Sequence, residues 1–156
     1  MKILLPIDGS ELSLHEVRFA IRLVREGLQA QFLLANVQEP ASLYEMVTLP
    51  DPAALDDISY AAGEHVLQAA QQLLEQAGIP YATAVATGDP VHALVDLIEE
   101  QGCELVVMGS RSSGAFLSAL QGSVSQSLAH ASPVPVLLVK PPAELVAPRD
   151  LPEDLT

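Results

Sequence analysis

A segment rich in glycine and serine, from Gly109 to Ser125, carries residue types that can hold phosphate groups. Gly109 follows an apolar run and allows the backbone to turn and to come close to a ligand. Gly122, Ser123 and Val124 open a predicted helix, whose first N–H groups and positive dipole end favour an anion. Judged by spacing alone, an ordinary turn followed by a capped helix is an equally good interpretation.

Further donors lie in the same segment, because Ser123 and Ser125 have hydroxyl groups and Arg111 is a cation. Elsewhere the sequence offers little reactive chemistry. The four histidines lie on different predicted helices, and none has a partner at the spacing of a zinc-binding helix. Cys103 precedes a buried strand and is interpreted as a small core residue. Because no triad, paired carboxylate or positioned base is visible, we expect a binding protein with at most slow hydrolysis.

The segment is positioned by alternating strand and helix patterns. Apolar runs predict five strands, over residues 3–7, 31–37, 81–87, 104–108 and 134–139. Apolar residues at three- and four-residue spacing predict helices over residues 11–28, 58–77, 89–101 and 123–131. Ser10 is the predicted N-cap of the first helix, and Gly78 and Gly102 are predicted to end the second and third. Residues 39–57 have no clean period and are predicted to form a long loop.

This alternation predicts an α/β protein with an open five-stranded parallel sheet and helices on both faces, a Rossmann-like arrangement. Ligands of such sheets bind beyond the carboxyl ends of the strands, where the strand order reverses. The loops after Ile7, Val37 and Met108 share that edge. The first strand lacks the Gly-x-Gly-x-x-Gly of dinucleotide sites, the chain lacks a P-loop lysine motif, and the acidic pair of a response regulator is absent.

Composition and charge limit the partners. The chain has 156 residues, of which 49% are hydrophobic and 17% charged, which indicates one globular domain. Its net charge of −13 argues against nucleic acid and anionic membranes as partners. No apolar stretch approaches the roughly 18 residues of a membrane-spanning helix. We therefore expect a cytoplasmic protein with a folded domain over residues 1–140 and a proline-rich, acidic tail over residues 141–156.

Four stretches of the sequence together resemble one known family, the universal stress proteins. The run from Lys2 to Ser10 resembles the first strand and turn of that family, and Glu104 to Arg111 resembles its fourth strand with the loop that follows. Ser132 to Val139 resembles its last strand. Between them, a Gly-x-x-Gly-like turn, nine residues and Gly122-Ser123 resemble the family's ATP loop. The resemblance covers roughly residues 1–140 and implies a stress-response sensor or regulator that binds ATP, with Mg²⁺ or Mn²⁺ as an accompanying ion.

The resemblance also implies roles for residues at matching positions. Pro6 and Asp8 line the edge of the site, with the Asp8 carboxylate near the ribose or a metal ion, and the backbone around Val37 faces the adenine. From the residues alone, Asp8 is as readily a turn acid that binds its own backbone, and Val37 is strand core. The nucleotide-binding residues implied in full are Pro6, Asp8, Val37, Met108, Gly109, Arg111, Ser112, Gly122, Ser123, Val124 and Ser125.

One position departs from the family pattern, because Ser112 stands where the loop has its second glycine. If this position needs a positive φ, serine costs about 1 kcal/mol or more relative to glycine. The alternative function is therefore that of a family member that binds no nucleotide and works as a dimeric protein-interaction module. In either case the resemblance, together with the apolar last strand from Val134 to Val139, predicts a homodimer paired through that strand.

Overall fold

A computed structural model describes residues 1–40, 47–48, 51–110 and 124–142 of the chain. Its strands form one parallel sheet in the order β3-β2-β1-β4-β5, which confirms the predicted fold class. The strands are β1 (Lys2–Pro6), β2 (Gln31–Gln38), β3 (Tyr81–Thr87), β4 (Leu105–Gly109) and β5 (Val136–Val139). The helices are α1 (Glu11–Arg25), α3 (Pro52–Ala77), α4 (Pro90–Gln101) and α5 (Val124–Ala131).

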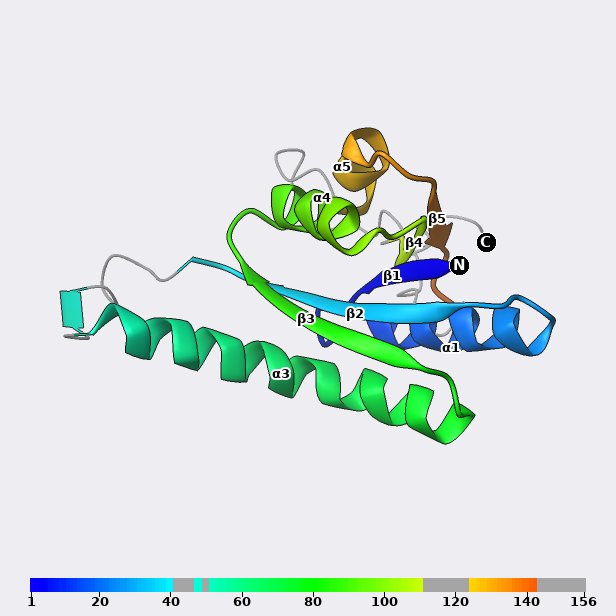
Figure 1. Ribbon diagram of the computed structural model, residues 1–156, viewed down its shortest axis with the longest axis horizontal. Coiled ribbons are helices and arrows are strands. Elements are labelled where there is room, and N and C mark those ends of the chain that lie inside the picture. Colours follow the sequence, from blue (N-terminus) through cyan, green and yellow to red (C-terminus); the bar gives the residue numbers. More distant parts are fainter. Residues whose placement is uncertain (41–46, 49–50, 111–123, 143–156) are drawn as a thin grey trace, which may run out of the picture.

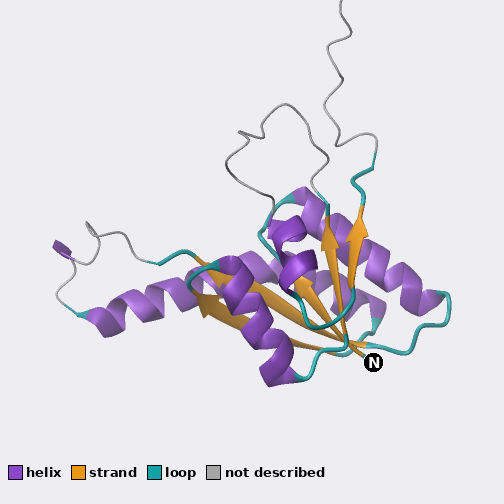
Figure 2. Cartoon of the chain, turned by 90° about the horizontal axis from the view of Figure 1, so that it is seen from above, coloured by secondary structure: helices purple, strands orange, loops and turns teal. Residues whose placement is uncertain are grey.

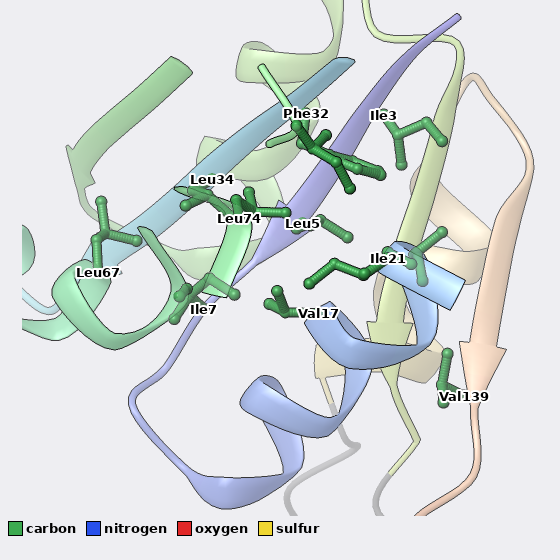
Figure 3. Packing of buried hydrophobic residues seen from close by; sticks show 14 residues of the cluster. Ile3, Leu5, Ile7, Val17, Ile21, Phe32, Leu34, Leu67, Leu74 and Val139 are labelled. Carbon is green, nitrogen blue, oxygen red and sulfur yellow. The ribbon is translucent and has the colours of Figure 1, made fainter. Parts of the chain in front are cut away.

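Two helix layers cover the sheet, α1 and α3 on one face and α4 and α5 on the other (Figure 1). Side chains alternate between the faces along each strand, as the pleat requires. On β1, Ile3 and Leu5 pack toward α1 and α3, whereas Leu4 packs toward α4 and α5. Figure 3 shows the first cluster, in which Val17 of α1 lies beside Ile7. The buried runs of the central strands therefore form two hydrophobic clusters, one on each face.

The sheet pairing is uneven across its centre. β1 pairs with β2 along its whole length, from Lys2 to Pro6, but pairs with β4 only at Ile3 and Leu4. All strands run in the same direction and fan apart toward their carboxyl ends (Figure 2). The chain leaves β1 toward β2 on one side and reaches β4 on the other, so the strand order reverses between β1 and β4. Ligand sites of open parallel sheets lie at such reversals.

Local capping explains where most elements begin and end. Ser10 caps α1 by accepting the Ser13 N–H at 3.2 Å, and Gly78 and Gly102 end α3 and α4 with left-handed backbones, as predicted. The start of the second helix was predicted wrongly. α3 begins at Pro52, because the Asp51 carboxylate accepts the Ala53 N–H at 3.0 Å and starts the helix within the predicted loop.

The middle of α3 approaches the sheet closely at Gly63. A Cβ atom added there would lie 2.4 Å from Cγ1 of Val85 on β3, and 3.2 Å from Oδ1 of Asn36 on β2. Gly63 is buried within the helix, where glycine normally costs stability relative to alanine. Glycine is nevertheless needed at this position, because the absence of a side chain lets α3 lie directly on the two strands.

We expect Gly63→Ala to lower the free energy of unfolding by about 1–3 kcal/mol, because overpacking against Val85 outweighs the gain in helix propensity. In a Val85→Ala background the same substitution is expected to cost much less, because the obstructing methyl groups are gone and only the 3.2 Å contact with Oδ1 of Asn36 remains. Urea unfolding of the four proteins of this double-mutant cycle measures both effects. A destabilisation of equal size in both backgrounds would contradict the close contact.

Candidate functional site

The predicted site residues that the structure describes gather at the carboxyl edge of the sheet. Pro6 ends β1, Asp8 lies in the turn that follows, and Gly109 ends the neighbouring strand β4. Val37 lies near the end of β2, where it is half-buried and packs with the second cluster. Met108 is buried in the same cluster. Four predicted residues lie outside the described part of the chain: Arg111, Ser112, Gly122 and Ser123.

Asp8 forms the local turn that the sequence left as one of two interpretations. Its Oδ1 accepts the Ser10 N–H at 2.9 Å and the Ser10 hydroxyl at 2.5 Å. Ser10 in turn caps α1. The carboxylate of Asp8 is exposed at the edge of the sheet, so the bonds that build the turn also hold a negative charge beside the end of β1.

The end of β4 directs its backbone N–H groups in opposite directions. Val106 and Ser110 donate to Pro135 and Val139, on the β5 side, at 2.9 and 2.8 Å. Because alternate residues of a strand point to opposite sides, the Gly109 N–H faces β1. The β1 ladder has already ended there. The Gly109 N–H is satisfied instead by Oε2 of Glu16, on α1, at 2.5 Å.

Glu16 is a functional candidate that the sequence analysis missed. It is only 2% exposed, and among the described residues no group donates a hydrogen bond to its Oε1. Burial raises the pKa of the Glu16 carboxyl well above its ordinary value, the Gly109 N–H opposes this, and the charge of Asp8 raises it further. Two acids therefore share the edge where strand order reverses, and the buried one holds its proton more tightly than an ordinary glutamate.

A helical spacing could have revealed Glu16. The buried residues of α1 recur at positions that place them on one stripe: Ser13, Glu16, Val17, Ala20 and Ile21. The apolar spacing that predicts this helix runs through Leu14, Val17, Ile21, Val24 and Leu28, of which Val17 and Ile21 are buried and the other three only partly buried. A glutamate at an inward position of a helix is rare unless it has a partner, and that rarity was the available signal.

Gly109 is required by packing within the chain. The φ angle of Gly109 is not positive, whereas other described glycines, such as Gly9 and Gly78, have a positive φ. A Cβ atom at Gly109 would lie 2.6 Å from Cγ of Leu12 on α1. The sequence suggested that glycine allows the chain to turn at this point. In the structure, the reason for glycine is instead the close approach of α1 to the end of β4.

Polar contacts also tie the ends of β1 and β2 together. Asn36 is buried, and its Nδ2 donates to the Ile7 carbonyl at 2.7 Å. Its Oδ1 accepts from Nε2 of Gln38 at 2.5 Å. A buried side chain with both ends bonded holds its neighbours in one arrangement. The rim of the site is thus preorganised on the β2 side as well as on the β4 side.

Helix α5 begins at Val124, within one residue of its predicted start. Val124 is 39% exposed, and Ser125 is buried. The positive end of the helix dipole therefore lies at the residue where the sequence placed a phosphate contact.

Other reactive residues stay apart. Cys103 is buried, as predicted, and burial raises the pKa of its thiol. Among the residues that the structure describes, no three His, Cys, Asp or Glu side chains are grouped to hold a metal ion. A hollow of about 280 Å³ between β3 and α4 is lined with acids, including Asp96 and Glu100, which disfavours an anion there. No helix in the described ranges is long and apolar enough to span a membrane.

The parallel order, the two helix layers and the reversal between β1 and β4 define a doubly wound α/β protein with a candidate ligand edge. Comparison with known sequences narrows this class. The model of the "Universal stress protein family" matches residues 1–140. The chain belongs to the universal stress protein family.

Individual relatives agree with this assignment. The chain is 31% identical over 147 residues to the universal stress protein YxiE of Bacillus subtilis, covering 89% of this chain and 98% of the relative. A universal stress protein solved in complex with cAMP is 26% identical, with a TM-score of 0.64 and coverage of 89% and 95%. An Arabidopsis thaliana family member with AMP bound shares the fold, with 18% identity, a TM-score of 0.70 and coverage of 96% and 97%.

Glu16 makes stability depend on pH. Because the folded chain binds this proton more tightly than the unfolded chain, the contribution of Glu16 to the free energy of unfolding falls as the pH rises from about 4.3 through the raised pKa. The fall is at most about 1.4 kcal/mol per pH unit. Glu16→Gln keeps an oxygen acceptor for Gly109 and cannot ionise, so we expect its stability advantage over the wild type to grow with pH.

Urea unfolding at several pH values measures this difference, with Glu11→Gln, an exposed substitution on the same helix, as the matched control. The control is expected to follow the wild-type profile. Parallel pH profiles for the wild type and Glu16→Gln would show that the buried carboxyl does not carry the effect.

Proposed function

We propose that this chain binds an adenine nucleotide at the carboxyl edge between β1 and β4, and acts in the cytoplasm as a sensor or regulator of the stress response. The proposal treats it as a binding protein whose hydrolysis of ATP, if measurable, is slow. The observation that carries the proposal is the reversal of strand order at this edge, because ligands of open parallel sheets bind there.

Two further observations support the proposal. Helix α5 starts at Val124, and the positive end of a helix dipole favours a phosphate group. The family member that is 26% identical to this chain was solved with cAMP, which makes adenine nucleotides the first ligands to test. The sequence resemblance favours ATP among them.

Charge is the main obstacle to this function. The chain carries a net charge of −13, and Asp8 and Glu16 lie at the proposed site. We infer that a divalent cation, Mg²⁺ or Mn²⁺, accompanies a triphosphate, because it offsets charge that the chain itself does not neutralise.

Two matched variants at Val124 test nucleotide binding. Val124→Glu places a carboxylate at the first residue of α5, where it repels a phosphate but interacts favourably with the helix dipole. We expect it to weaken binding of ATP with Mg²⁺ by about tenfold or more, or 1.4 kcal/mol, without loss of stability. The side chain in Val124→Gln has nearly the same shape as that in Val124→Glu but no charge. We expect Val124→Gln to bind ATP with Mg²⁺ much more tightly than Val124→Glu does.

Equilibrium titration measures both affinities, and a Gly122→Ala, Ser123→Ala double variant provides a second test of the segment. Negligible binding by the wild type and all variants would overturn the proposal. Equal affinities of the Glu and Gln variants would show that no phosphate group binds at the start of α5.

The alternative function, a protein-interaction module without nucleotide, has one observation in its favour. The first two N–H groups at the end of β4, those of Gly109 and Ser110, are both used within the chain. The substitution Ser112→Gly restores the family pattern and separates the two functions. Binding by the variant but not by the wild type would establish the alternative.

We also propose a homodimer formed through the edge strand β5. The strand pairs with β4 on one side, and its Leu137 and Leu138 are each 38% exposed. An apolar edge strand is normally paired or covered, because it otherwise promotes aggregation. Pairing with the same strand of a second copy satisfies this requirement.

Leu138→Arg is expected to convert the dimer to a monomer at low micromolar concentration, because it places a charge in the paired edge. Thr83→Arg puts the same charge on an exposed position of β3, at the opposite edge of the sheet, and is expected to leave the dimer intact. Sedimentation velocity measures the oligomeric state. A monomeric wild type, or a dimer that survives Leu138→Arg, argues against this interface.

A further inference from the structure

Glu16 connects the interior of the protein to the proposed ligand edge. Its Oε2 accepts the Gly109 N–H at 2.5 Å, in the place where a neighbouring strand would otherwise supply a carbonyl. Its Oε1 is buried, and no described residue donates to it. Because an ionised carboxylate is costly to bury with one oxygen unpaired, Oε1 is the atom that takes a proton when the carboxyl becomes neutral.

We propose that Glu16 is a positioning residue that couples the binding of an anionic ligand at the carboxyl edge to the uptake of one proton at Oε1. This inference rests on the proposed function and specifies how that site is regulated. In both protonation states one oxygen of the carboxyl accepts the Gly109 N–H, so the end of β4 stays in place while its charge changes.

The charged groups around Glu16 make it sensitive to a ligand. Asp8, in the turn after β1, raises the pKa of the Glu16 carboxyl through its negative charge. Strand β4 (Leu105–Gly109) has no titratable side chain. The other acidic, basic and histidine residues of the packed elements are exposed, except Lys2 and His15, which are half-buried: Lys2 of β1, Glu11, His15, Arg18, Arg22 and Arg25 of α1, and Asp56, Asp57, Glu64, His65 and Glu75 of α3. Among the described groups, Asp8 is thus the charged residue whose effect on the pKa of the Glu16 carboxyl is resolved.

An anionic ligand beside Asp8 and Gly109 adds a second negative charge near Glu16. That charge favours the protonated carboxyl, and by linkage the protonated carboxyl favours the ligand. Between the pKa values of the free and the bound protein, affinity is expected to fall by up to about tenfold per pH unit as the pH rises. The protein therefore binds its ligand more tightly at lower pH.

The test uses cAMP as the probe, because its phosphodiester does not titrate near neutral pH, unlike a phosphate monoester with a second pKa of about 6. Isothermal titration calorimetry of the full chain, between about pH 5.5 and 8.5, gives the affinity. Repeating it in buffers with different ionisation enthalpies counts the protons taken up. Glu16→Gln is the test variant and Glu11→Gln the matched control.

In the wild type and in Glu11→Gln we expect affinity to rise as the pH falls, with uptake of up to one proton for each cAMP bound. In Glu16→Gln we expect an affinity that does not depend on pH and no proton uptake. Binding with the same pH profile in the wild type and Glu16→Gln would overturn the coupling and leave the proposed function intact. Absence of cAMP and ATP binding in every protein at every pH would overturn both.

A measurement without ligand tests the first half of the coupling. The chemical shift of the Gly109 amide is expected to titrate with pH in the wild type, because its acceptor changes charge, and to lose this titration in Glu16→Gln. In Asp8→Asn the midpoint is expected to move to lower pH, since one negative charge has been removed. A Gly109 amide that responds to pH identically in the wild type and Glu16→Gln would overturn the inference whatever the ligand.

Discussion

The hydrogen bond from the Gly109 N–H to Glu16 is the interaction on which the proposed site depends. Once β4 separates from β1 beyond Val106, the Gly109 N–H loses its strand partner, and a buried unpaired N–H is costly. Glu16 supplies the acceptor from α1. The close approach that this bond needs leaves no space for a side chain at Gly109, because Leu12 lies against it. One helix therefore fixes both the position and the residue type at the strand end.

Most of the fold was predictable from the sequence, because it follows from local periodicity and turn chemistry. The strand from Tyr81 to Thr87 and the helix from Pro90 to Gln101 were predicted to the residue or nearly so, since a capping Asp89 and a terminal Gly102 mark the helix ends. The start of α3 was not predicted, because Asp51 caps a helix whose first turns lack a clean apolar pattern.

The site was predictable only in part, for a different reason. Asp8 and Gly109 follow strands, so their location at one edge follows from the topology. The bond that joins α1 to β4 is a contact between residues 93 positions apart, and no local pattern specifies it. Glu16 was overlooked because a glutamate on a helix is normally solvated. The roles implied for Ser112 and Gly122 remain predictions, since both lie outside the described residues.

The same bond bears on how a strongly acidic chain would bind an anion at the proposed site. A basic side chain would attract a phosphate permanently, whereas the pKa of the Glu16 carboxyl is shifted mainly by burial, with opposition from the Gly109 N–H and a further rise from the charge of Asp8. The chain instead places an acid where burial opposes its ionisation, so the local charge depends on a proton rather than on a fixed cation. In the proposed coupling the anion and the proton favour each other, so the occupancy of the edge would depend on pH. If the chain acts by binding alone, as proposed, such an equilibrium would be enough to report a change in pH.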